Sequence, residues 1–369
     1  MHLTQEHHIL FSCLQVALWP LAKHEVLPVA EYNANPEKLY RLAASQGVLG
    51  LTLDGMPREF PVTDRALRLR WELSVQQMEF RYKRQCEVLK ELVLLFRSQG
   101  VELMLLKGTG ISMLYPRPEH RECGDIDIYL MGDYDKGNRI IESLGIEVDT
   151  KSSKHSNFFY KGVPVENHKT FLNVSDSRTD SNLEQGLHRI LSEQGTDTIM
   201  LDDVPVRIPK PDFSAVFLTR HAIVHFLASG LVLRHFCDLA LFFETNKERI
   251  NTGFIEKMMI CENQFLLLNS FLAIGRKYLG QPDGFFSVSK ADSELAEKWA
   301  ERVLEDTFCP RINRKERDEL SKMSVLRRKW TGLKYFAASK WKYDTIRKGL
   351  FEQVLFYKSV RYLRISNWR

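Results

Sequence analysis

The sequence lacks both long apolar stretches and clustered cysteines. No run of about 18 or more uncharged apolar residues occurs, which argues against a membrane-spanning helix. The six cysteines stand apart with no Cys-x-x-Cys pair, so neither a zinc cluster nor a disulfide framework is expected. Free thiols are typical of a reducing compartment and predict a cytoplasmic protein.

A basic leader and a small-residue cleavage site are also missing at the start of the sequence. Glu6 and Gln15 interrupt the apolar residues there, a pattern that predicts an amphipathic helix rather than a signal peptide. Hydrophobic residues make up 44% and charged residues 27% of the chain, as in ordinary globular proteins rather than disordered ones. A length of 369 residues predicts two domains, or one domain with large additions.

The positive charge of the chain is concentrated near its end. The net charge is +5, but residues 311–369 hold 17 lysines and arginines against 5 acidic residues. The rest of the chain holds 35 basic against 42 acidic residues and is therefore slightly negative. The tail thus differs in character from everything before it.

The periodicity of apolar residues divides the chain into helical and strand-like parts. It predicts helices at 5–21, 36–46, 63–98, 108–115, 133–144, 212–228, 231–245, 252–279 and 291–307, with basic helices between 313 and 364. It predicts strands at 101–107, 125–130, 145–149, 156–162 and 163–169, and a hairpin at 198–208. We therefore expect an α+β fold with four parts: a helical N-terminal region (1–99), a small mixed-sheet α/β core (100–210), a helical domain (211–310) and a basic, aromatic-rich helical tail (311–369).

The sequence Gly-Asp-Ile-Asp-Ile-Tyr-Leu carries two acids on a predicted strand. Asp125 and Asp127 are two residues apart, so their carboxylates point to the same face and repel each other unless a positive charge lies between them. Paired carboxylates suit Mg²⁺ or Mn²⁺, and two such ions can clamp a phosphoryl group in transfer. Glu166, on a later strand, is the candidate third ligand, and His168 can orient it.

A glycine-rich turn precedes the acids. Gly108 and Gly110 allow close approach of a phosphate, and Thr109 adds a hydroxyl. Lys107 and Arg121 can neutralise phosphate oxygens. Alone, each motif is weak, because a solvated strand end or a tight turn explains it equally well. Their order, which places the turn and the acids at the ends of neighbouring strands, favours a ligand site.

The segments Leu-Leu-Lys-Gly, Tyr-Pro-x-Pro and Gly-Asp-Ile-Asp resemble the polymerase-β-like nucleotidyltransferases, and within them a bacterial family of uncharacterised nucleotidyltransferases. The resemblance implies that Gly108 and Thr109 hold a triphosphate and that Asp125, Asp127 and Glu166 bind two Mg²⁺ (or Mn²⁺) ions. It implies transfer of a nucleoside monophosphate to an acceptor hydroxyl or phosphate, with release of pyrophosphate. The chain departs from the pattern in its Thr109, in its Glu166 in place of aspartate, and in a longer gap before Asp125.

The acceptor stays open, with a sugar, a lipid headgroup, a peptide and a protein as candidates. The alternative to an enzyme is a non-catalytic nucleotide-binding protein, or a membrane-surface scaffold that uses the basic tail. Among other polar residues, Arg234 and His235 are candidates to reach the nucleotide or its acceptor, and Arg234 is placed to pair with Asp238. His221 and His225 have the spacing of a metal pair, but helix packing explains them more simply.

Aromatic residues alternate with lysine and arginine in the tail, including Trp330, Trp341 and Tyr357. This pattern suits an acidic membrane surface or an anionic acceptor, and a nucleic acid less well because no RNA-binding signature is present. A location peripheral to the inner face of the membrane is therefore an alternative to the open cytoplasm. The simpler explanation is a packed helix pair whose outer face is basic.

Overall fold

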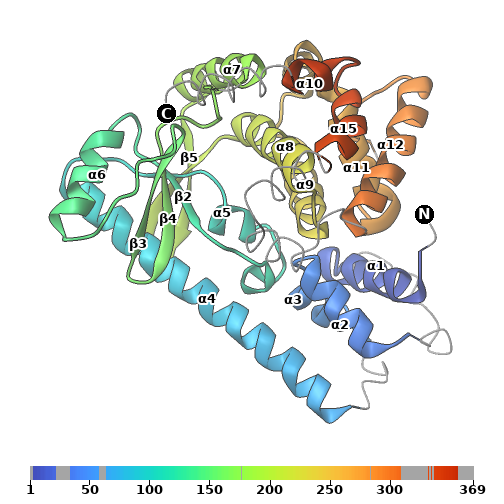
Figure 1. Cartoon of the computed structure of the whole chain (residues 1–369). Helices are drawn as coiled ribbons and strands as arrows, with labels where there is room; N and C mark the ends of the chain where they lie inside the picture. The colour runs from blue at the N-terminus through green and yellow to red at the C-terminus, as the bar shows by residue number, and fades with distance from the viewer. Residues whose placement is uncertain are drawn as a thin grey trace.

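The computed structural model contains a six-stranded mixed sheet with helices on both faces, and most of the helices lie to the right of the sheet in Figure 1. The structure describes residues 3–21, 34–57, 64–175, 177–282, 284–308, 331, 334 and 336–355. The strands are β1 Met104–Leu105, β2 Ile126–Tyr129, β3 His155–Tyr160, β4 Val163–His168, β5 Thr196–Leu201 and β6 Val204–Pro209. The expected α+β fold is confirmed.

The helices account for most of the remaining described residues. Before the sheet lie α1 Gln5–Leu18, α2 Pro36–Ser45, α3 Leu49–Asp54 and α4 Arg65–Ser98. Within the sheet region lie α5 Thr109–Ser112, the short 3-10 helix η2 Pro118–His120, α6 Tyr134–Ser143 and α7 Arg178–Gln194. After it follow α8 Pro211–Ala228, α9 Leu233–Thr245, α10 Thr252–Cys261, α11 Phe265–Leu279, α12 Lys290–Phe308 and α15 Lys340–Asp344. No helix among these residues is both long enough and apolar enough to cross a bilayer.

The strand order is β3-β4-β2-β1-β6-β5. Two hairpins, β3–β4 and β5–β6, form the edges, and the central strands β4 and β2 run parallel to each other. The register places Asp127 beside Glu166, and His168 lies opposite His155 across the β3–β4 hairpin. Since side chains two residues apart share a face, Glu166 and His168 point to the same side of the sheet.

Alternation along the strands gives the sheet two different faces. Ile126, Ile128 and Val165 point to one face and join a core with the long helix α4 and with α6. Asp127 and Tyr129 point to the other face, which α8 and α9 cover (Figure 1). The polar residues of β2 and β4 therefore look toward the helical half of the molecule.

The helix α4 is built as its sequence predicts. Asp64 caps its start by accepting hydrogen bonds from the backbone amides of Ala66 and Leu67. Gly100, with a φ of 65°, ends it in a conformation that glycine adopts without a steric penalty. The second half of the helix covers one sheet face with Val88, Leu89, Leu92, Val93 and Phe96, whereas Trp71, Val75 and Met78 in its first half join the core of the N-terminal helices.

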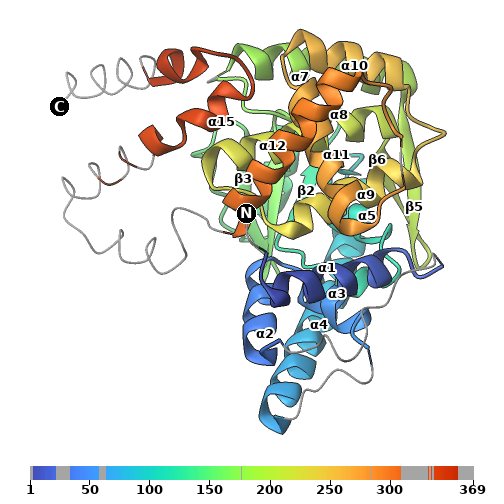
Figure 2. The ribbon, with the colours of Figure 1, turned by 90° about the vertical axis from the view of Figure 1, so that its right-hand side faces the viewer.

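The N-terminal helices pack against the helices that follow the sheet. Gln15 Nε2 donates to Tyr278 O at 3.1 Å, and Trp19 Nε1 donates to Leu279 O at 2.7 Å. Figure 2 shows α1 lying next to the α11 and α12 region. One hydrophobic cluster runs from α1 through α8 and α9 to α12. The division into four parts at 99, 210 and 310 stays a prediction.

Several element predictions differ from the structure. The strand expected at 101–107 covers only Met104–Leu105, and the short helix α3 was not expected. The single helix expected at 252–279 is two helices, because Asn263 adopts a left-handed φ of 57° between them. The strand expected at 145–149 is reduced to one bridge between Asp149 and Asn157. Helix α7 was not expected at all, although Ser177 caps it in the usual way.

Most of the basic tail lies outside the described residues. Where it is described, it is packed: Trp341 stacks on Trp299 with ring centroids 6.2 Å apart, and the buried Lys342 pairs with Asp306. Two of the basic and aromatic residues that suggested a membrane surface are therefore interior residues. Surface binding by the tail stays a prediction.

Candidate active site

Three carboxylates converge on the face of the sheet that looks toward α8 and α9. Asp125 directly precedes β2, Asp127 lies within it, and Glu166 lies beside Asp127 on β4. One oxygen from each carboxylate lies within 4.8 Å of the others. The Asp127 side chain is 1% exposed, whereas those of Asp125 and Glu166 are 37% and 24% exposed. The cluster of three carboxylates is therefore buried at Asp127 and accessible to solvent at Asp125.

Lys107 supplies the positive charge that the two aspartates require. Its Nζ lies 3.0 Å from Asp127 Oδ2 and 3.9 Å from Asp125 Oδ1. Burial works against the charged form of all three groups, but these carboxylates still raise the pKa of Lys107. The pKa of Asp127 lies well below its usual range despite burial, because Lys107 and His168 favour the carboxylate. Burial and the neighbouring Asp127 raise the pKa of Asp125.

Two imidazoles extend the acidic group. His168 Nε2 lies 3.1 Å from Asp127 Oδ1 and 3.5 Å from Glu166 Oε2, and burial does not prevent these carboxylates from raising its pKa. His155 Nδ1 lies 3.1 Å from Glu166 Oε2, and burial lowers its pKa. His155 was not among the site residues predicted from the sequence. Only the β3–β4 register, which pairs it with His168, brings it to this place.

Gly108 lies at the bend between β1 and α5, next to the acids. Its φ is 71°, and a Cβ there would stand 3.3 Å from the carbonyl oxygen of Asp125. The position thus favours glycine both for its backbone conformation and for the close approach. Thr109 is 2% exposed, and a Cβ on Gly110 would meet Leu105 and Ile208. Both residues face the protein interior rather than the pocket described below.

Arg121 is held by a buried ion pair. Its Nε and Nη2 donate to the two oxygens of Asp238 at 2.6 and 2.8 Å, and its Nη1 donates to Gly108 O at 3.3 Å. Asp238 is thereby occupied, and the predicted pair between Arg234 and Asp238 does not form. Arg234 Nη1 donates instead to Glu122 O at 3.1 Å. The fork of Arg121 reaches both carboxylate oxygens at once, which is the stronger arrangement.

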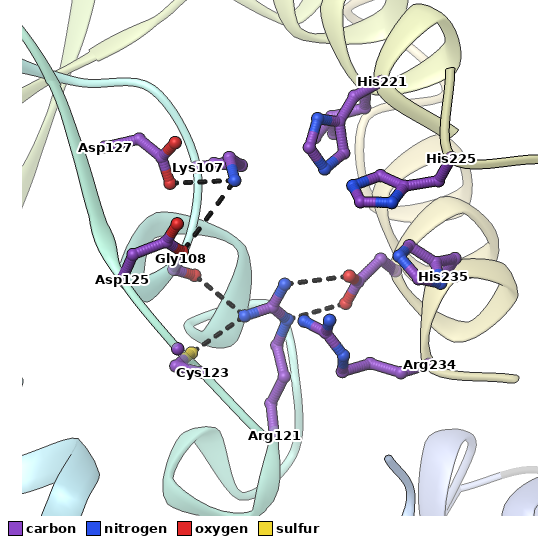
Figure 3. Close-up of a pocket in the computed structure, with 13 residues that line it drawn as sticks. Lys107, Gly108, Arg121, Cys123, Asp125, Asp127, His221, His225, Arg234 and His235 are labelled. Carbon is purple, nitrogen blue, oxygen red and sulfur yellow. Dashed lines mark hydrogen bonds and ion pairs between the residues drawn. The ribbon is translucent and has the colours of Figure 1, made fainter. Parts of the chain in front are cut away.

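A pocket of about 260 Å³ separates the acids from α8 and α9. Lys107, Gly108, Arg121, Asp125 and Asp127 line one side; His221, His225, Arg234, His235 and Asp238 line the other (Figure 3). The ring centroid of His225 lies 4.5 Å from that of His221 and 5.2 Å from that of His235.

His221, His225 and His235 form one side of the pocket, called here the histidine wall, and their imidazoles are neutral near pH 7. Burial is the main cause in each case: it lowers the pKa of His221 and His225, with help from Lys107, and that of His235 to about 3, with help from Arg234. The spacing of His221 and His225 favoured a packing role, but both side chains line the pocket. Their helical spacing alone could not show which side α8 turns toward the sheet.

A family model described as uncharacterised nucleotidyltransferase matches residues 32–277, more than half of the chain. The protein is therefore a transferase, of the class that moves nucleotidyl groups from a nucleoside triphosphate. It belongs to this family of uncharacterised nucleotidyltransferases, as the resemblance in its sequence indicated.

Two further comparisons add little. No curated protein sequence matches the chain significantly. A solved structure, an antigenic nucleotidyltransferase-like protein from Paracoccidioides brasiliensis, aligns with 13% identity over 52% of this chain and 88% of that chain. Its TM-score of 0.31 is too low to support any conclusion about a common fold.

Proposed function

We propose that the protein transfers a nucleoside monophosphate from a nucleoside triphosphate to an acceptor hydroxyl or phosphate, in a Mg²⁺-dependent reaction that releases pyrophosphate. The observation that carries the proposal is the convergence of Asp125, Asp127 and Glu166 within 4.8 Å, with Asp125 and Asp127 lining the pocket. The family supplies the class of reaction, and this cluster supplies a place for it.

The donor set fits a hard divalent cation. All three side chains offer carboxylate oxygens, which Mg²⁺ and Mn²⁺ prefer, and the ammonium of Lys107 already shows that a positive charge is stabilised between them. Asp125, Asp127 and Glu166 would hold one or two such ions. When bound, these ions supply charge stabilisation for the phosphoryl group and activation of the acceptor oxygen.

The rest of the pocket can position the triphosphate. Gly108 leaves its backbone open to a phosphate, and Lys107 can turn from the aspartates to phosphate oxygens once other cations balance the carboxylates. The charge of Arg121 is balanced by Asp238, and its bonds to Asp238 and Gly108 O hold the glycine turn in place. Thr109 and Gly110, which begin α5, are proposed to support this turn from within.

The wall formed by α8 and α9 is the proposed acceptor side. Its three neutral imidazoles can donate or accept hydrogen bonds, and Arg234 adds the only fixed positive charge contributed by the pocket residues of these helices. An acceptor that carries hydroxyls and an anionic group suits this combination better than a purely apolar one. His168, behind the acids, is proposed to orient Glu166 and Asp127.

A pyrophosphate-release screen tests the proposal. The protein is incubated with each of the four nucleoside triphosphates, Mg²⁺ and fractionated cell extract, and nucleotidylated products are identified by mass spectrometry. We expect release with the wild type and with Asp135→Asn, an exposed control on α6. The double variant Asp125→Ala, Asp127→Ala should release none; unchanged turnover in that variant rejects the assignment.

A further inference from the structure

Two histidines and a glutamate form a second cluster of metal-ligand type beside the three acids. His155 and His168 face each other across the β3–β4 hairpin, and Glu166 shares their face of the sheet. One ligand atom from each of the three side chains lies within 4.8 Å of the other two. This set contains two nitrogens and one oxygen, so its chemistry differs from that of the carboxylate group.

A hydrogen bond to a backbone carbonyl fixes the ring orientation of His168. Its Nδ1 lies 3.2 Å from the carbonyl oxygen of Thr170, which can only accept a hydrogen bond, so Nδ1 carries the proton. Nε2 points toward the oxygens of Asp127 and Glu166 and donates its own proton to Asp127; a bound metal ion would displace that proton and take the lone pair of Nε2. A backbone carbonyl that fixes the second ring nitrogen in this way is the usual partner of a metal-binding histidine.

His155 provides an independent observation. Its Nδ1 is buried and makes no hydrogen bond with any residue in the described part of the chain, although Glu166 Oε2 lies only 3.1 Å away. A buried polar nitrogen without a hydrogen bond is costly. A cation shared by the nitrogen and the carboxylate removes that cost, because each atom then has a ligand role.

Two of the three ligand separations fit a tetrahedral first-row metal ion. In tetrahedral zinc sites with bonds of about 2.0–2.1 Å, neighbouring ligand atoms are about 3.3 Å apart. The two measured separations, His155 Nδ1 to Glu166 Oε2 and His168 Nε2 to Glu166 Oε2, are 3.1 and 3.5 Å. Imidazole nitrogens also favour first-row transition metals over Mg²⁺.

We propose that His155, Glu166 and His168 bind a divalent first-row transition-metal ion of the Zn²⁺ type. Three protein ligands leave a fourth coordination position open. This site goes beyond the proposed nucleotidyl transfer and differs from the proposed Mg²⁺ site in two of its three ligands. Glu166 is common to both, so the ion held by the histidines influences how Glu166 serves the carboxylate group.

Co²⁺, which reports its own coordination in visible absorption, is the probe for this site. Chelator-treated full-length protein is titrated with Co²⁺, and then with Zn²⁺ to displace it. We expect d–d bands of a four-coordinate ion at one equivalent in the wild type, and Zn²⁺ should abolish them. The affinity should fall by about 10²-fold or more in His155→Ala and in His168→Ala.

The controls separate this site from the proposed Mg²⁺ site. Asp125→Asn, which alters only the carboxylate group, should keep the Co²⁺ bands, and so should His8→Ala, an exposed histidine on α1. Loss of the bands in Asp125→Asn, or unchanged bands in His155→Ala, overturns the proposal. If the histidine variants do not fold, pulsed EPR of wild-type protein decides: nitrogen coupling to bound Co²⁺ is expected, and its absence overturns the site.

Discussion

At the scale of single residues, Lys107 explains how the molecule tolerates two acids side by side. Its ammonium lies 3.0 Å from the buried oxygen of Asp127 and is itself only 17% exposed. A buried charge pair of this kind costs much when one partner is lost, because the remaining charge has no compensation. Lys107 thus acts as an internal counterion, a role that the proposed divalent ion would take over.

Lys107→Met tests this role. In a chelating buffer the variant should lose about 3 kcal/mol of unfolding free energy, since the buried charge of Asp127 keeps only His168 as a partner. Addition of Mg²⁺ should restore most of the loss and should stabilise the variant more than the wild type. Denaturant unfolding with and without Mg²⁺ measures both effects. Lys151→Met, at a position 91% exposed, is the control, and an equal Mg²⁺ response in all three proteins contradicts the account.

The residues of the site were predictable to different degrees. The pair Asp125 and Asp127 follows from strand spacing, and Glu166 from its place on a later strand. His155 could not be identified, because its role depends on which strands pair and in which register. The partner of Asp238 was predicted wrongly for a similar reason: helical spacing suggests Arg234, whereas the fold brings Arg121 from a distant loop.

At the scale of elements, a buried histidine fastens the loop that carries Arg121. His120 ends η2, and its two ring nitrogens lie 2.7 Å from Asp54 Oδ2 on α3 and 2.9 Å from Glu79 Oε1 on α4. Burial lowers the pKa of His120, but these hydrogen bonds outweigh it and raise the pKa overall. Each of the two contacts needs a proton on its own ring nitrogen. The doubly protonated imidazolium form therefore joins the loop to both helices.

The contribution of His120 should therefore depend on pH. A folded-state pKa raised above the usual 6.5 means that its contribution is complete below that value and is lost as pH rises through the folded-state pKa. We expect His120→Gln to cost about 2 kcal/mol of unfolding free energy near pH 6, and much less near pH 9. Urea unfolding of both proteins across this range gives the difference. A cost that is constant or rises with pH contradicts the charged form.

The helix α15 depends on another buried pair. Lys342 and Asp306 on α12 have side chains only 8% and 7% exposed, and Lys342 Nζ also donates to Phe226 O at 3.0 Å. Lys342→Met should cost about 3–5 kcal/mol of unfolding free energy, because Asp306 stays charged. The double variant Lys342→Met, Asp306→Leu should recover at least half of this cost in chemical denaturation. A double variant as unstable as the single one would show that the pair itself is not the cause.

Most elements were predictable because their signals are local. The capping residue Asp64, the apolar stripe of α4 and the turn at Gly100 all lie within one stretch of sequence. The break at Asn263 was not, since asparagine in a left-handed conformation leaves no periodicity signal. Helix α7 was missed although its apolar positions, such as Leu183 and Leu187, are buried against the main core.

At the scale of the whole molecule, the pocket lies between two parts that are distant in sequence. The sheet supplies the acids and the glycine turn, and α8 and α9 supply the histidine wall (Figure 3). Sequence patterns locate each part, but they do not show that the two face each other across about 260 Å³ of space. The wall that we propose as the acceptor side could therefore be recognised only from the fold.

The packing of Trp341 and Lys342 in the interior determines how membrane binding by the basic tail can be tested. Truncation near residue 310 removes Trp341 and Lys342 from the interior and leaves Asp306 without its partner. We expect such a truncated protein to lose stability whether or not the tail binds membranes, so its failure to float with anionic liposomes decides nothing alone. Flotation of the intact chain, compared between neutral and anionic vesicles, is the informative experiment: no binding to either removes the membrane hypothesis.

Calorimetric titration with a non-hydrolysable nucleoside triphosphate analogue tests the central claim most directly. The wild type and the control Asp135→Asn should bind the analogue with Mg²⁺ and lose at least about 10²-fold in affinity in a chelating buffer. Asp127→Asn, which keeps the shape of the side chain and removes its charge, should bind equally weakly with and without Mg²⁺. If the wild type binds as tightly without Mg²⁺, or if Asp127→Asn keeps the metal-dependent gain, the carboxylates do not hold the ion that carries the nucleotide.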